Sequence, residues 1–259
     1  MMYNGVQCEF PPGYDGTVLL ERLQPILDPE LDESILQLGF IQSLHVHNGH
    51  ATIVVQLPTS WCAANFAYMM ADDIRRALLT VEGIHHVTVH LRDHFAAEAI
   101  ETAVNAGKPF AEAFPGEGCG SLTALRMTFL HKGFTSRQER LLRALRAVSF
   151  LPEDICALHV GDVVVQGDAC VVQRAGRASI EVGAAETLCR YLARRAELGL
   201  DCAATAPLMI DLCGQPLTVE RLEAYYQAAR TVRVSLEANG LFCRTLLTVC
   251  QSNAGECVR

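Results

Sequence analysis

The chain has 259 residues, half of them hydrophobic, so it is long enough to bury one large core or two small ones. Its formal net charge of −8 argues against a generally basic surface for nucleic acid or anionic lipid. No segment reaches the roughly 18 consecutive apolar residues of a membrane span, and the polar start of the chain does not resemble a secretory signal. We therefore expect a cytoplasmic protein without nucleic-acid or membrane partners. Its 11 scattered cysteines, none in a C-x-x-C pair, are expected to be mostly thiols.

The first third of the chain predicts a small two-layer α/β domain over residues 15–93. Asp32 is the expected N-cap of its second helix, and Asn48-Gly49 is a strong signal for a two-residue hairpin. The expected elements, in chain order, are helices 17–27 and 32–38, strands 40–47 and 51–57, helix 63–79 and strand 84–91. Without the short helix 32–38, this is the order α-β-β-α-β.

The remaining residues predict two further segments, so the fold class is α/β (α+β) overall. A helical extension is expected over 94–135, and its glycine-rich loop 115–120 is the best candidate for a domain boundary. A mainly helical domain with a short β-sheet is expected over 136–259. Its expected helices lie near 141–148, 184–198, 216–234 and 241–250, with strands inside 155–182.

Cys62 is the best candidate for a reactive residue because it opens the helix expected over 63–79. Unpaired N–H groups and the helix dipole favour thiolate over thiol at such a position, and thiolate is the form that binds iron or attacks a disulfide. The alternative is a small buried residue that packs the helix start. Cys156, Cys189 and Cys243 lie among apolar residues and are expected to pack as small hydrophobes.

Three motifs follow one another at fixed points of this small domain. They are Asp28-Pro29-Glu30, then Leu57-Pro58-Thr59-Ser60-Trp61-Cys62, then Val87-Thr88-Val89-His90-Leu91. With them, residues 17–92 resemble the metal-sulfur cluster biosynthesis family, whose members include the iron–sulfur assembly proteins SufT and PaaD. The chain departs from the family at Pro58-Thr59 and at Ala63, where the family has a different proline arrangement.

The resemblance implies a non-catalytic maturation factor, or adaptor, that transiently holds iron or an iron–sulfur cluster. It assigns Cys62 as the metal ligand and Asp28 and Glu30 as the functional acidic motif. The implied partners are a client metalloenzyme, other assembly proteins or a second copy of the chain in a homodimer. Residues 107–126 resemble the extension of family members encoded beside bacterial diiron alkane monooxygenases, which implies a diiron monooxygenase as the client.

Histidines suggest a second metal site on the sheet. His45 and His47 share one face of the first hairpin, and His86 and His90 share one face of the third strand, because side chains alternate along a strand. Imidazole suits iron, zinc or copper. The alternative is a solvated face of the sheet, since neither pair has metal-site spacing by itself.

Residues 136–252 follow the element order of the catalytic domain of tyrosine recombinases (phage-integrase type), with a hairpin around residues 174–177. Strand cleavage would need a His-x-x-Arg cluster and a nucleophilic tyrosine near the end of the domain. No histidine follows His159, and the last tyrosine, Tyr226, comes too early. A catalytically inactive recombinase-like module that binds DNA or protein is therefore the alternative function. A thiol-dependent enzyme using Cys62 ranks last because the sequence gives it no partner base.

Overall fold

The computed structural model describes residues 2–3, 6–11, 14–116, 122–173 and 179–256. Contacts divide the chain into two compact units. Unit 1 comprises residues 1–126 together with 236–259, and unit 2 comprises residues 127–235. Helices and strands alternate in a mixed arrangement, which confirms the expected α/β class. Unit 1 is thus built from two segments that are far apart in the sequence.

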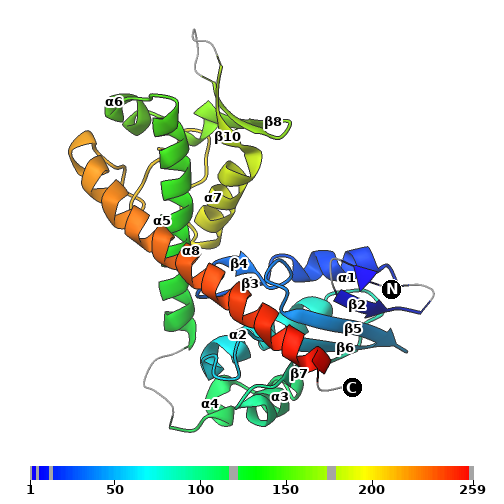
Figure 1. Ribbon diagram of the computed structural model, residues 1–259. Coiled ribbons are helices and arrows are strands. Elements are labelled where there is room, and N and C mark those ends of the chain that lie inside the picture. Colours follow the sequence, from blue (N-terminus) through cyan, green and yellow to red (C-terminus); the bar gives the residue numbers. More distant parts are fainter. Residues whose placement is uncertain (1, 4–5, 12–13, 117–121, 174–178, 257–259) are drawn as a thin grey trace. The chain divides into compact units, whose positions relative to one another are not determined.

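Unit 1 is centred on a five-stranded sheet of order β1-β2-β5-β6-β7 (Figure 1). Asn48 and Gly49 have φ values of 48° and 76° between β5 and β6, which confirms the expected tight hairpin. Strand β7 pairs parallel with β6, while β1 and β2 extend the sheet at the other edge and were not predicted from the sequence. The strands are β1 (Met2–Tyr3), β2 (Val6–Glu9), β5 (Ile41–His47), β6 (His50–Gln56) and β7 (His86–Arg92).

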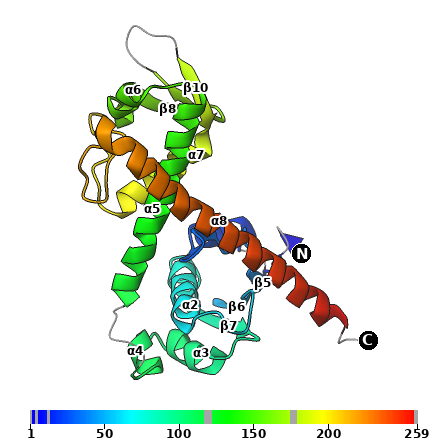
Figure 2. The ribbon, with the colours of Figure 1, turned by 60° about the vertical axis from the view of Figure 1, so that its left-hand side comes forward.

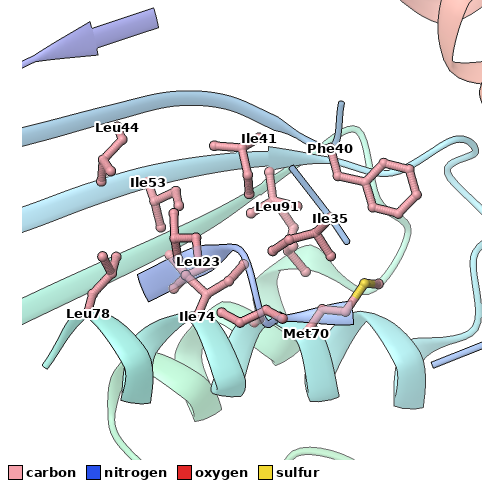
Figure 3. Packing of buried hydrophobic residues seen from close by; sticks show 14 of the residues in the cluster. Leu23, Ile35, Phe40, Ile41, Leu44, Ile53, Met70, Ile74, Leu78 and Leu91 are labelled. Carbon is pink, nitrogen blue, oxygen red and sulfur yellow. The ribbon is translucent and has the colours of Figure 1, made fainter. Parts of the chain in front are cut away.

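Helices cover one face of this sheet and enclose the core of unit 1. Side chains from β5, β6 and β7 meet those of the long helix α2 around Ile53, Ile74 and Leu91, all 5% exposed or less (Figure 3). Asp15 caps α1 by accepting a hydrogen bond from the Thr17 N–H at 2.8 Å. The helices are α1 (Gly16–Leu23), α2 (Ala64–Leu78), α3 (Ala97–Asn105) and α4 (Phe110–Ala113).

The helix expected over 32–38 is wrong. Strands β3 (Leu27–Asp28) and β4 (Glu33–Ser34) pair there instead, and turns follow up to Gly39. Asp32 cannot cap a helix at this place because its φ of 56° lies in the left-handed region. The Asp28 side chain accepts hydrogen bonds from the next backbone N–H groups and so closes a turn rather than a helix.

Helix α3 protects β7, which is the edge strand of the sheet. The Asn105 side chain accepts from the Val89 N–H at 2.8 Å and donates to the Val89 carbonyl at 3.0 Å. Glu101 accepts from the Leu91 N–H at 2.7 Å. These side chains satisfy backbone groups that an edge strand would otherwise offer to another strand.

Unit 2 packs helices against a three-stranded antiparallel sheet of order β10-β9-β8. Its apolar core encloses a buried polar cluster. The Tyr191 hydroxyl donates to Gln138 Oε1 at 2.8 Å or to the Leu208 carbonyl at 2.5 Å, and Arg195 donates to both this hydroxyl and this carbonyl at 3.0 Å. The elements are α5 (Leu122–Ala147, from residue 127 on), α6 (Pro152–Cys156), β8 (Val163–Gln166), β9 (Ala169–Val172), β10 (Ile180–Ala184), α7 (Ala185–Glu197) and the first part of α8 (Val219–Glu256).

The two helices expected over 216–234 and 241–250 are one uninterrupted helix, α8 (Figure 2). No proline stands between them, and one interior glycine, Gly240, is a tolerable cost. The hairpin expected around residues 174–177 lies outside the described residues. None of the helices in the described part of the chain has the length and apolar character that a membrane crossing needs.

Candidate functional site

Cys62 lies on a turn immediately before α2. The N-cap of the helix is Ala63 and its first residue is Ala64, so Cys62 stands just outside the first turn in which we expected it. Its sulfur is half-buried and lies 3.5 Å from Thr59 Oγ1. The Thr59 hydroxyl is within hydrogen-bonding distance of the sulfur, and either atom can be the donor. The turn thus supplies the sulfur with a partner that the helix dipole alone would not.

His94 fixes the backbone of this turn from the neighbouring loop. Its Nε2 donates to the Cys62 carbonyl at 2.8 Å, and its Nδ1 accepts from the Ala96 N–H at 3.2 Å. These two bonds together require the neutral tautomer with the proton on Nε2. Burial lowers the pKa of His94, which also favours the neutral ring. His94 therefore positions the Cys62 backbone and has no nitrogen left to act as a base for the sulfur.

An exposed aromatic pair flanks Cys62. The Trp61 and Phe95 rings stack with centroids 5.9 Å apart and planes 21° apart, and the two residues are 79% and 58% exposed. The Phe95 N–H donates to the Ser60 carbonyl at 3.0 Å, which ties the two loops together beneath the rings. Large apolar side chains gathered at the surface of a protein are typical of interaction sites.

The acidic motif is divided between a structural and an exposed carboxylate. Asp28 is only 8% exposed, and its Oδ1 accepts from the N–H groups of Glu30 and Leu31 at 2.8 and 2.9 Å. Burial raises the pKa of Asp28 to about 6, and the charges of Glu30 and Glu33 act in the same direction against those two hydrogen bonds. Glu30 is exposed. Asp28 thus shapes the loop, while Glu30 remains accessible to a partner.

Cys243 of α8 also reaches this region, which the sequence did not predict. It is half-buried and packs against the core of unit 1, as expected for a small hydrophobe. Burial, and to a smaller extent the charges of Asp28, Cys62 and Glu30, raise the pKa of Cys243 to about 11. No local pattern points to this neighbourhood, because the residues involved lie about 180 positions or more from Cys243 in the sequence. Cys189, which we also expected to pack as a small hydrophobe, is exposed instead.

The histidines occupy the sheet face opposite the core. His45 lies 3.2 Å from Glu9 Oε2, and His90 lies 3.0 Å from Glu101 Oε2. His47 is paired in register with His50, and His50 with His86. Across the described residues no group of three or more His, Cys, Asp or Glu side chains is arranged to hold a metal ion. A second metal site at His45, His47, His86 and His90 therefore stays a prediction.

The family comparison concerns the part of the chain that carries Cys62. Residues 17–91 match a family described as iron-sulfur cluster assembly protein, which is under a third of the chain. The comparison with curated proteins found no match, and neither did the comparison with solved structures. The expected resemblance of the second half to tyrosine recombinases has no support from these comparisons.

Proposed function

We propose that this protein matures an iron-dependent or iron–sulfur client enzyme, with Cys62 as an exchangeable ligand for the metal cargo. The observation that carries the proposal is a half-buried thiol beside the Thr59 hydroxyl, on a turn whose backbone is bonded by His94, inside a segment matched by an iron–sulfur assembly family. A handover needs a weakly held cargo. One protein thiolate, completed by ligands of the client, supplies such a site because the client can take the metal without breaking a closed coordination sphere.

The chemistry assigns separate roles around the sulfur. Thiolate is the form of Cys62 that binds iron, and the Thr59 hydroxyl lies 3.5 Å from the sulfur. His94 holds the Cys62 carbonyl, so the sulfur keeps its direction during exchange. Trp61 and Phe95 offer an apolar surface to the client beside the sulfur. A thiol-dependent enzyme is a poorer fit, since both nitrogens of His94 already have backbone partners.

A diiron monooxygenase is the client that we propose among iron enzymes. The support is the likeness of the extension at residues 107–126 to that of family members encoded beside diiron alkane monooxygenases. The Tyr68 hydroxyl of α2 donates a hydrogen bond to the Lys108 carbonyl of this extension at 2.5 Å. Arg126 of the extension forms an ion pair with Asp73 of α2 at 2.7 Å. The extension is therefore anchored to the same helix that follows Cys62.

The test compares Cys62→Ala with Cys213→Ala, a matched control at an exposed cysteine of unit 2. A host strain that lacks the protein is complemented with each variant, and iron–sulfur and diiron enzyme activities are measured in extracts. We expect Cys62→Ala to fold and to restore no client activity, and Cys213→Ala to restore all of it. Full complementation by Cys62→Ala, with client activities equal to those restored by Cys213→Ala, would end the proposal.

A further inference from the structure

Residues 236–247 of α8 place four apolar or small residues on one side of the helix. Leu236, Gly240, Cys243 and Leu247 follow one another at intervals of four, three and four residues, which places them on one side of a helix. Leu247 is 4% exposed and belongs to the core of unit 1. Leu241 and Phe242, which point away from this face, are 65% and 64% exposed. We call residues 236–247 the C-terminal segment.

This segment lies against residues 28–39, which we call the acidic loop. Arg244 forms an ion pair with Glu33. A Cβ atom added to Gly240 would stand 3.2 Å from Glu33 Oε1, so the missing side chain permits the close approach. A Cβ atom added to Gly39, at the end of the same loop, would stand 3.7 Å from Leu247 Cδ2. Polar and apolar contacts thus join the segment to the loop at Glu33 and at Gly39.

Cys243 lies between these anchors, on the side of the helix that Gly240 and Leu247 share. It follows Gly240 by three residues and precedes Leu247 by four, so the anchored turns carry it toward unit 1. It is half-buried there, within electrostatic range of Asp28, Glu30 and Cys62. The segment therefore packs against the loop that carries the acidic motif, at Glu33 and Gly39, and brings Cys243 within electrostatic range of Cys62.

We propose that the surface formed by the acidic loop and Cys62 binds a helix with an arginine and a leucine three residues apart, and that residues 236–247 occupy it as an intramolecular plug. The occupied state restricts access to Cys62. A partner that reaches the sulfur displaces the segment, whose hold depends on the Arg244–Glu33 ion pair and on Leu247. This inference rests on the proposed function for its biological role, but not for its measurement.

The experiment measures site-resolved alkylation of the full-length chain by iodoacetamide, with mass spectrometry. Arg244→Glu replaces the ion pair by two facing carboxylates, so local opening of the segment should become more frequent. We expect alkylation of both Cys243 and Cys62 to accelerate at least about fivefold. The double variant Glu33→Arg with Arg244→Glu restores an ion pair of opposite polarity and should return both rates to near wild type.

Arg76→Glu is the matched control, because it breaks an exposed ion pair with Asp72 on α2 of the same unit and should leave both rates unchanged. Leu247→Ala tests the apolar anchor by a second route, and fluorescence of Trp61 checks that unit 1 stays folded. Unchanged alkylation in both Arg244→Glu and Leu247→Ala overturns the proposal. Acceleration at Cys243 alone also overturns it, because the segment would then not restrict Cys62. The alkylation rates of Cys62 and Cys243 are measured without any client enzyme. The plug can therefore be refuted while Cys62 remains the cargo ligand, and Cys62 can fail as the cargo ligand while the plug stands.

Discussion

Replacing Asp28 by asparagine should stabilise unit 1 at neutral pH. Burial raises the pKa of Asp28 from its ordinary value of 3.8 to about 6, so its ionisation is less favourable in the folded state. Asparagine keeps an oxygen that accepts from the N–H groups of Glu30 and Leu31, and it carries no charge. Because a tenfold change in ionisation is worth about 1.4 kcal/mol, the rise in pKa corresponds to a gain of up to about 3 kcal/mol.

The dependence on pH follows from proton linkage. Below about pH 4 the carboxyl is protonated in both the folded and the unfolded state, so Asp28 contributes its full stability there. Between about pH 4 and pH 6 the unfolded chain releases this proton while the folded one retains it. Wild type then loses stability relative to Asp28→Asn by up to about 1.4 kcal/mol per pH unit. The two proteins should be nearly equal near pH 4 and differ most above pH 7.

Urea unfolding followed by Trp61 fluorescence measures this difference, because the only tryptophan of the chain lies in unit 1. Asp28→Ala serves as the control. It removes the acceptor altogether and should destabilise unit 1 by about 1–3 kcal/mol across the pH range. The reasoning is refuted if Asp28→Asn is less stable than wild type at pH 7.5, or if the difference between them does not change with pH.

Three further substitutions test the packing by urea unfolding, monitored by circular dichroism. Asn105→Ala should cost about 1–3 kcal/mol, because both backbone groups of Val89 lose their partner. Tyr191→Phe should cost about 1–2 kcal/mol, since Gln138 loses a buried hydrogen-bond partner in unit 2. Gly49→Ala should cost at least about 1 kcal/mol, because its φ is 76° and the added Cβ would lie 2.9 Å from a backbone oxygen. If the free energy of unfolding of any of these variants changes by less than about 0.5 kcal/mol, the stabilising role assigned to the corresponding contact is contradicted.

Local signals predicted the parts of unit 1 that depend on local chemistry. Asn48-Gly49 fixed the hairpin, and the periodicity of residues 63–79 predicted α2 to within one residue at either end. The helix expected over 32–38 is wrong because the Asp28 side chain offers the backbone a turn that competes with the helix. The apolar spacing of that segment fits either outcome, and only the burial of Asp28 decides between them.

The candidate site shows the same division. Cys62 and the acidic motif could be named from the sequence through the family resemblance, since their order and spacing lie within one short segment. His94 and Cys243 could not, because their partners are set by contacts between loops and by the return of α8 to unit 1. A histidine after a strand and a cysteine in an apolar helix carry no pattern that reveals such contacts.

The division of unit 1 between two distant segments has a consequence for the order of events during protein synthesis. A domain near the start of a chain ordinarily folds while the rest is still on the ribosome. Here Leu247 contributes to the core of unit 1, and Arg244 pairs with Glu33. The sheet and α2 can assemble early, but the final packing waits until more than a hundred intervening residues have been made. During that interval the loop lacks its contacts with Arg244 and Leu247, so a nascent chain exposes the surface of unit 1 on which the C-terminal segment later packs.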